Sequence, residues 1–214
     1  MTEQEWLDCQ NSRTMLEFVR PKVTKRKLRL FAAACFRRLA RLLPDIRQQQ
    51  AVEMLEETPV EINLQQSVVH GARVALPSSQ DSFGGNFAGI DDPYFVGLML
   101  YRELVSSSTA HHATVVPDGL FDRAKEQAEQ SRLLRCICGP LTFHAIPVDP
   151  AWLTSTVVTL AQAIFDDRAF DRMPDLIDAL EQAGSTNSHI LDHCRESGPH
   201  VLGCWVVDLL IGKS

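Results

Sequence analysis

Histidine and cysteine side chains concentrate near the C-terminal end of this chain, where their spacing suits metal binding. Three of the seven histidines lie between positions 189 and 204, together with two of the six cysteines. His189 and His193 are four residues apart, and so are His200 and Cys204. On a helix this spacing places both side chains on one face, about 6 Å apart, so each pair could hold one zinc ion. A turn at residues 196–199 that folds one pair onto the other would complete a four-ligand site.

The same residues also fit a structural role in a hydrophobic core, and this is the interpretation that the sequence favours. Free cysteine is among the most buried residue types, and a cysteine inside a core is usually inert. Buried imidazoles are ordinarily satisfied by hydrogen bonds to neighbouring groups. On this interpretation the chain holds no cofactor; on the alternative it holds zinc through His189, His193, His200 and Cys204.

A thiol-based catalytic centre meets a geometric obstacle. Thiolate catalysis pairs a cysteine with a histidine that a third group orients, and Cys204, His200 and Asp208 are of the right types. Asp208, however, lies eight residues past His200, which on a straight helix is about 12 Å away. No other catalytic signature stands out. The sequence therefore predicts a protein that is not an enzyme, and the alternative is a zinc or thiol enzyme centred on His193, His200 and Cys204.

A strongly basic helix is expected near the N-terminus. Ten of the 21 lysines and arginines lie between Arg20 and Arg47, with only one of the 27 acidic residues. Such a stripe could follow a phosphate backbone, so nucleic-acid binding through residues 22–41 is a second alternative function. The absence of aromatic residues on the charged face and the pI of about 5.6 favour pairing with acidic residues of the same chain instead. The candidate binding residues are Arg26, Arg29, Arg37, Arg38 and Arg41.

Length and composition indicate one globular domain in the cytoplasm. The chain has 214 residues, of which 45% are hydrophobic and 22% are charged, as is ordinary for a globular protein. No apolar run reaches the roughly 18 residues of a membrane span, and the acidic N-terminus lacks the pattern of a secretory signal. The scattered cysteines are interpreted as free thiols of a reducing compartment. No membrane partner is expected.

Apolar residues recur at helical spacing along most of the chain, which predicts an all-α bundle or array of about eight to ten helices. A Gly/Ser-rich loop at 77–92 separates the N-terminal helices (1–76) from the C-terminal helices (93–214) of this single domain. The last segment also has the Val, Ile and Trp content of a buried strand, but a helix is favoured because no partner strand is apparent. Helices are expected at 15–19, 25–43, 47–57, 60–75, 93–104, 117–136, from 150 to about 165, from 174 to just before Gly184, at 190–194 and at 200–211.

Both ends of the chain resemble a large paralogous family of uncharacterised bacterial proteins. At the start, the resemblance rests on EWL, MLEF and RKLRLFAAACFRR; at the end, it rests on DPAWL, HCR and GPHVLGCWVVDLLIGK. It covers residues 1–57 and 149–214, and it includes His193, His200 and Cys204 but not clearly His189. Cys136 and Cys138 fall outside the pattern, and the single residue between them is not the spacing of a zinc knuckle. The resemblance implies no activity; it suggests a recruitment or regulatory role.

The function expected from the sequence is that of a non-enzymatic helical module that binds a protein partner. This expectation depends on the uniformly amphipathic helices and on the charge separation, which suits docking.

Overall fold

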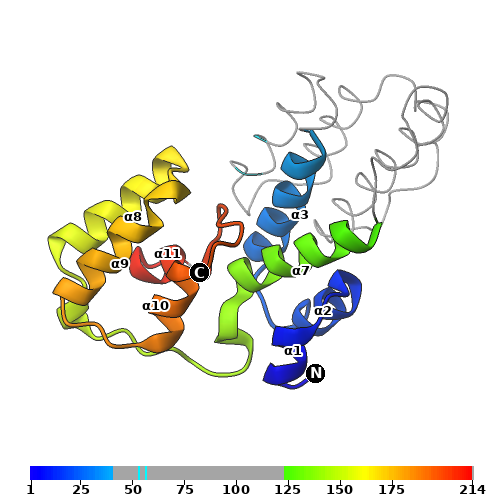
Figure 1. Cartoon of the computed structure of the whole chain (residues 1–214), viewed down its shortest axis with the longest axis horizontal. Coiled ribbons are helices and arrows are strands. Elements are labelled where there is room, and N and C mark those ends of the chain that lie inside the picture. The colour runs from blue at the N-terminus through cyan, green and yellow to red at the C-terminus, as the bar shows by residue number, and fades with distance from the viewer. Residues whose placement is uncertain (41–52, 54–55, 57–122, 214) are drawn as a thin grey trace. The chain divides into compact units, whose positions relative to one another are not determined.

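The regular secondary structure in the described part of the protein is all helical. The computed structural model describes residues 1–40, 53, 56 and 123–213, and it contains no strand within these ranges (Figure 1), which confirms the predicted all-α fold. Among the described residues, no helix combines the length and the apolar character needed to cross a bilayer. The α-helices are α1 (Glu3–Asp8), α2 (Ser12–Val19), α3 (Lys25–Ala40), α7 (Arg123–Cys138), α8 (Ser155–Asp167), α9 (Met173–Gln182), α10 (Ser188–Arg195) and α11 (Trp205–Leu210).

The chain divides into two compact units. The first combines Met1–Lys27 with Ala124–Ser214, and the second is Leu28–Arg123. The expected single domain stays a prediction. The predictions for 60–75, 77–92 and 93–104 lie outside the described residues, as does that for 47–57 apart from the helical Glu53 and Glu56. All the histidines and cysteines of the predicted site lie in the first unit.

In the first unit, the N-terminal helices are tied to the end of α7. Thr2 caps α1, and the backbone N–H of Thr2 donates in return to the Glu5 carboxylate at 2.7 Å, which is a capping box. The Arg135 guanidinium on α7 donates to the backbone carbonyls of Trp6 and Cys9, at 3.1 and 2.9 Å. These carbonyls would otherwise lack partners at the end of α1, so Arg135 both caps this helix and joins it to α7.

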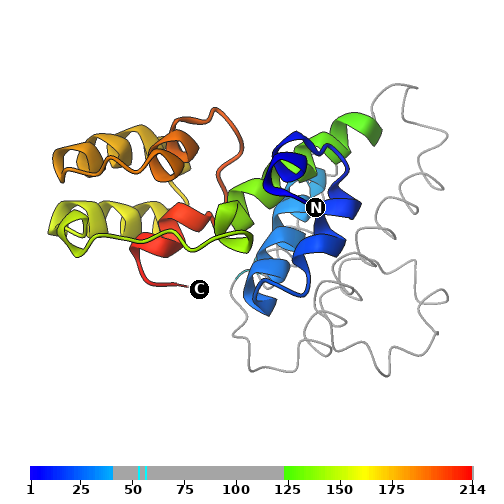
Figure 2. The same ribbon diagram turned by 90° about the horizontal axis from the view of Figure 1, so that it is seen from below.

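The C-terminal helices of the first unit enclose a hydrophobic core. Helix α8 packs against α9 and α11, and α10 packs against α9 and α11. Figure 2 shows the result as two layers, with α9 and α10 in one and α8 and α11 in the other. Helix α8 contributes Val157, Ala161 and Ile164 to this core, and all three are fully buried. This core holds the segments on which the candidate site depends.

The prediction of one helix across residues 200–211 is only partly right. The helix starts at Trp205, whereas residues 200–204 form a turn closed by a 2.8 Å hydrogen bond from the Cys204 N–H to the Val201 carbonyl. Gly203 has a φ of +90°, a conformation that favours glycine and interrupts helical geometry. His200 and Cys204 therefore approach each other across a turn rather than along a helix face.

A glycine brings the end of α7 against the start of α11. Gly139 follows α7 directly with a φ of +55°, and a Cβ atom there would lie 2.5 Å from the Trp205 ring. The missing side chain lets Trp205 contact the backbone at the end of α7. Because Trp205 is next to Cys204, this contact also sets how close Cys204 lies to the last turn of α7, which carries Cys136.

Candidate metal centre

Four side chains of the first unit converge in a geometry suited to a metal ion. One donor atom from each of Cys136, His193, His200 and Cys204 lies within 4.8 Å of the other three. The Cys204 sulfur is 3.3 Å from His193 Nε2 and 4.0 Å from His200 Nδ1. Ligands of tetrahedral zinc, at 2.0–2.3 Å from the ion, lie about 3.3–3.8 Å apart. The cluster is therefore close to the size of a zinc site before any adjustment.

Different elements bring the four residues together. Cys136 is in the last turn of α7, His193 is on α10, and Cys204 is the residue that precedes α11. His200 lies on the connection between α10 and α11. Cys136, His193 and Cys204 are buried, and only His200 is partly exposed.

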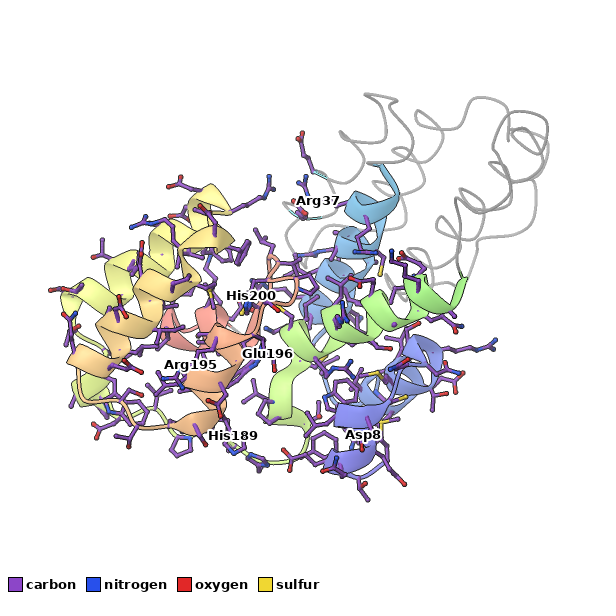
Figure 3. The ribbon with its side chains drawn as sticks, in the orientation of Figure 1. Asp8, Arg37, His189, Arg195, Glu196 and His200 are labelled. Atoms are coloured by element: carbon purple, nitrogen blue, oxygen red, sulfur yellow. The ribbon has the colours of Figure 1, made fainter. Side chains whose placement is uncertain are left out.

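Glu196 lies beside both imidazole rings, which are oriented in a way that suits metal binding. The His200 Nε2–H donates to the Glu196 backbone carbonyl at 3.1 Å, which leaves the lone pair on Nδ1 facing Cys204. The Glu196 carboxylate lies 3.8 Å from His193 Nδ1, so His193 offers Nε2 to the cluster. Figure 3 shows Glu196 and His200 close together on the segment after α10. Such outer partners are usual in zinc sites, where they orient the ligating imidazoles.

The cluster favours a thiolate at Cys204. Burial of the thiol opposes ionisation, but hydrogen bonding from Cys136 and the nearby His193 and His200 rings hold the pKa of Cys204 well below its usual value. The hydrogen bond to Cys204, together with burial, raises the pKa of Cys136 well above its usual value. For His200, burial lowers the pKa, but the hydrogen bond to Cys204 outweighs it and the net shift is upward. A thiolate is the form in which cysteine binds a metal.

We expect one thiol of the metal-free protein to ionise at an unusually low pH. Because the pKa of Cys204 is lowered, its thiolate absorbance in the ultraviolet should appear below the pH range of ordinary thiols, and Cys204→Ser should abolish this early step. Burial raises the pKa of Cys138 to about 12, so Cys138→Ser should leave the early step intact. An unchanged low-pH titration in Cys204→Ser would show that another group is responsible.

Of the four predicted ligands, the structure brings together three and replaces the fourth. His189 lies at the start of α10 (Figure 3), where its neighbours are Glu3 and His144 rather than the cysteines. Its place in the cluster is taken by Cys136. Sequence spacing could not indicate Cys136, which is 57 positions before His193. Only its position in the last turn of α7, beside the Gly139–Trp205 contact, brings it to the site.

Asp208 does not orient a catalytic histidine. Its buried carboxylate instead accepts from Arg26, at 2.7 and 3.1 Å, and from the Lys27 ammonium, at 2.5 Å. The Lys27 ammonium also donates to the Gly203 carbonyl at 2.7 Å. This cluster of charges joins the start of α3 to α11 and supports the turn that carries Cys204.

The predicted basic surface is in part engaged within the chain. Arg26 pairs with Asp208, and Arg37 makes two hydrogen bonds of 2.6 Å to the Glu56 carboxylate. Arg29 is buried, Arg38 is half-buried, and Arg41 lies outside the described residues. Arg26 and Arg37 thus have the intramolecular acidic partners that the sequence favoured.

No model of a known protein family matches the chain, and comparison with curated proteins and with solved structures also found no match. The resemblance to a paralogous bacterial family accordingly stays a prediction, and the candidate function depends on the geometry of the cluster.

Proposed function

We propose that this protein binds zinc through Cys136, His193, His200 and Cys204. The observation that carries the proposal is the convergence of two sulfurs and two imidazole nitrogens within 4.8 Å. Two thiolates and two imidazoles form a common zinc ligand set, and zinc accepts both donor types in a tetrahedral arrangement. The low pKa of Cys204 and the two contacts of Glu196 support the same proposal.

The proposed role of the ion is structural. Four protein ligands complete a tetrahedral shell, whereas catalytic zinc usually keeps one position for water or substrate. Cys204 has no exposed surface, which argues against a nucleophile that must meet a substrate. The ion would tie α7, α10 and the turn before α11 into one unit, near the core of the C-terminal helices.

With the ion in a structural role, we further propose that the protein is a non-enzymatic interaction or regulatory module that acts on a protein partner in the cytoplasm. All six cysteines are free thiols, which suits a reducing compartment. The alternative of nucleic-acid binding is less favoured, because Arg26 and Arg37 already pair with carboxylates of the same chain.

Metal content and a cobalt spectrum test the zinc proposal. Protein purified from zinc-supplemented culture should contain about one tightly held zinc per chain, and replacement by cobalt should give a thiolate-to-cobalt charge-transfer band. Cys136→Ser should lose at least about half of this band, because one of the two sulfur ligands is removed. The matched control is Cys138→Ser, the same change two residues away at a buried cysteine outside the cluster.

The charge-transfer band arises only from cobalt bound to sulfur. Cobalt bound elsewhere by residues without sulfur therefore does not contribute to it. A protein with neither bound zinc nor a cobalt band would contradict the proposal. Equal bands in Cys136→Ser and Cys138→Ser would remove Cys136 from the ligand set.

A further inference from the structure

A second group of metal-binding side chains lies in the first unit, apart from the cysteines. One donor atom each from Glu3, His144 and His189 lies within 4.8 Å of the other two. The Glu3 carboxylate is 3.8 Å from His144 Nδ1, and the centres of the His144 and His189 rings are 5.1 Å apart. His189 is exposed, and the Glu3 and His144 side chains are 40% and 38% exposed.

The segments that carry these residues are held independently of any ion. Glu3 is in the first turn of α1, whose ends are fixed by the Thr2 capping box and by Arg135. His144 follows the 3₁₀ turn at Gly139–Thr142, and its N–H donates to the Pro140 carbonyl at 3.2 Å. His189 is in the first turn of α10, which Asn187 caps. The backbone at these three residues is therefore ordered before an ion binds, which lowers the entropic cost of binding.

We propose that Glu3, His144 and His189 form a second zinc site at the surface, distinct from the buried cysteine-containing centre. Two imidazoles and one carboxylate are a known three-ligand zinc set that leaves a fourth position for water or for an anionic group of another molecule. With no sulfur donor and with exposed ligands, this site exchanges its ion more readily than the buried centre. Zinc bound there links α1 to α10 and so adds a metal bridge between the two ends of the chain.

The proposal also accounts for the pattern of histidines on α10. His189 and His193 are four residues apart, the spacing that suggested one shared ion. The structure places the first with Glu3 and His144, and the second with Cys136, His200 and Cys204. One helix thus contributes a ligand to each of two centres.

Calorimetric titration of zinc into full-length protein tests the second site. The protein is first given one equivalent of zinc to fill the tighter, cysteine-containing centre. A further, weaker binding step of about one zinc per chain is expected, and both His189→Ala and Glu3→Gln should weaken it at least about tenfold. The control is Asp192→Asn, which removes an exposed carboxylate from the same helix and should leave the step unchanged.

Cobalt distinguishes this site from the buried centre, since cobalt bound by Glu3, His144 and His189 adds no thiolate charge-transfer band. The second-site variants should therefore keep the full band of the first centre. A second step that survives intact in both His189→Ala and Glu3→Gln, or no second step in the unaltered protein, would overturn the proposal. Loss of the charge-transfer band alone would count against the buried centre and not against this site.

Discussion

Removing zinc from the protein should lower its melting temperature by about 10 °C. An ion that binds only the folded state adds roughly 4 kcal/mol when its free concentration is a thousand times its dissociation constant. For a chain of this size each kcal/mol corresponds to about 2–4 °C. The effect is expected because Cys136, His193, His200 and Cys204 come from separate segments that unfolding would disperse. Tryptophan fluorescence is a suitable probe, since all three tryptophans lie in the first unit.

Variants make this measurement specific to the buried centre. Cys136→Ser should melt at nearly the same temperature with zinc and with a chelator, whereas Cys138→Ser should keep the difference seen in the unaltered protein. Identical melting of the unaltered protein with and without zinc would rule out a structural role for the ion.

Asp208→Asn should reduce the free energy of unfolding by about 3–5 kcal/mol, the range found when one partner of a buried ion pair is removed. Asp208 is 2% exposed and Lys27 is 9% exposed, so the substitution leaves a buried ammonium without its countercharge. Arg26 donates to both oxygens of the same carboxylate, and asparagine keeps only one acceptor oxygen, so Arg26 loses at least one of these two hydrogen bonds. Urea unfolding followed by tryptophan fluorescence measures the change.

The control for Asp208 is an ion pair on the surface. Asp175 pairs with Arg172 at 3.3 Å, and both side chains are largely exposed, so Asp175→Asn should cost less than about 1 kcal/mol. Replacing Lys27 by methionine in the Asp208→Asn protein should recover part of the lost stability, because the unpaired charge is then gone. If Asp208→Asn lowered the free energy of unfolding no more than Asp175→Asn, the buried charge cluster would not stabilise the fold.

Local patterns were enough to predict most of the described helices. Helical spacing of apolar residues acts over a few neighbouring positions, and the helices expected from 150 to about 165 and from 174 to just before Gly184 lie close to the observed α8 and α9. The turn at 200–204 was missed because an apolar segment can pack either as a helix or as a turn followed by a helix, and Gly203 decides between them. Helix α11 begins at Trp205, the residue whose ring lies against Gly139.

The all-α class and the candidate ligands His193, His200 and Cys204 could be predicted from the sequence, because helical periodicity and residue type are properties of neighbouring positions. The packing of the helices, in contrast, brings Cys136 to these three residues, places His189 beside Glu3 and His144, and pairs Asp208 with Arg26 and Lys27. These contacts join residues far apart in the chain. They arise from how the helices pack in three dimensions, which the spacing of residues along the sequence does not encode.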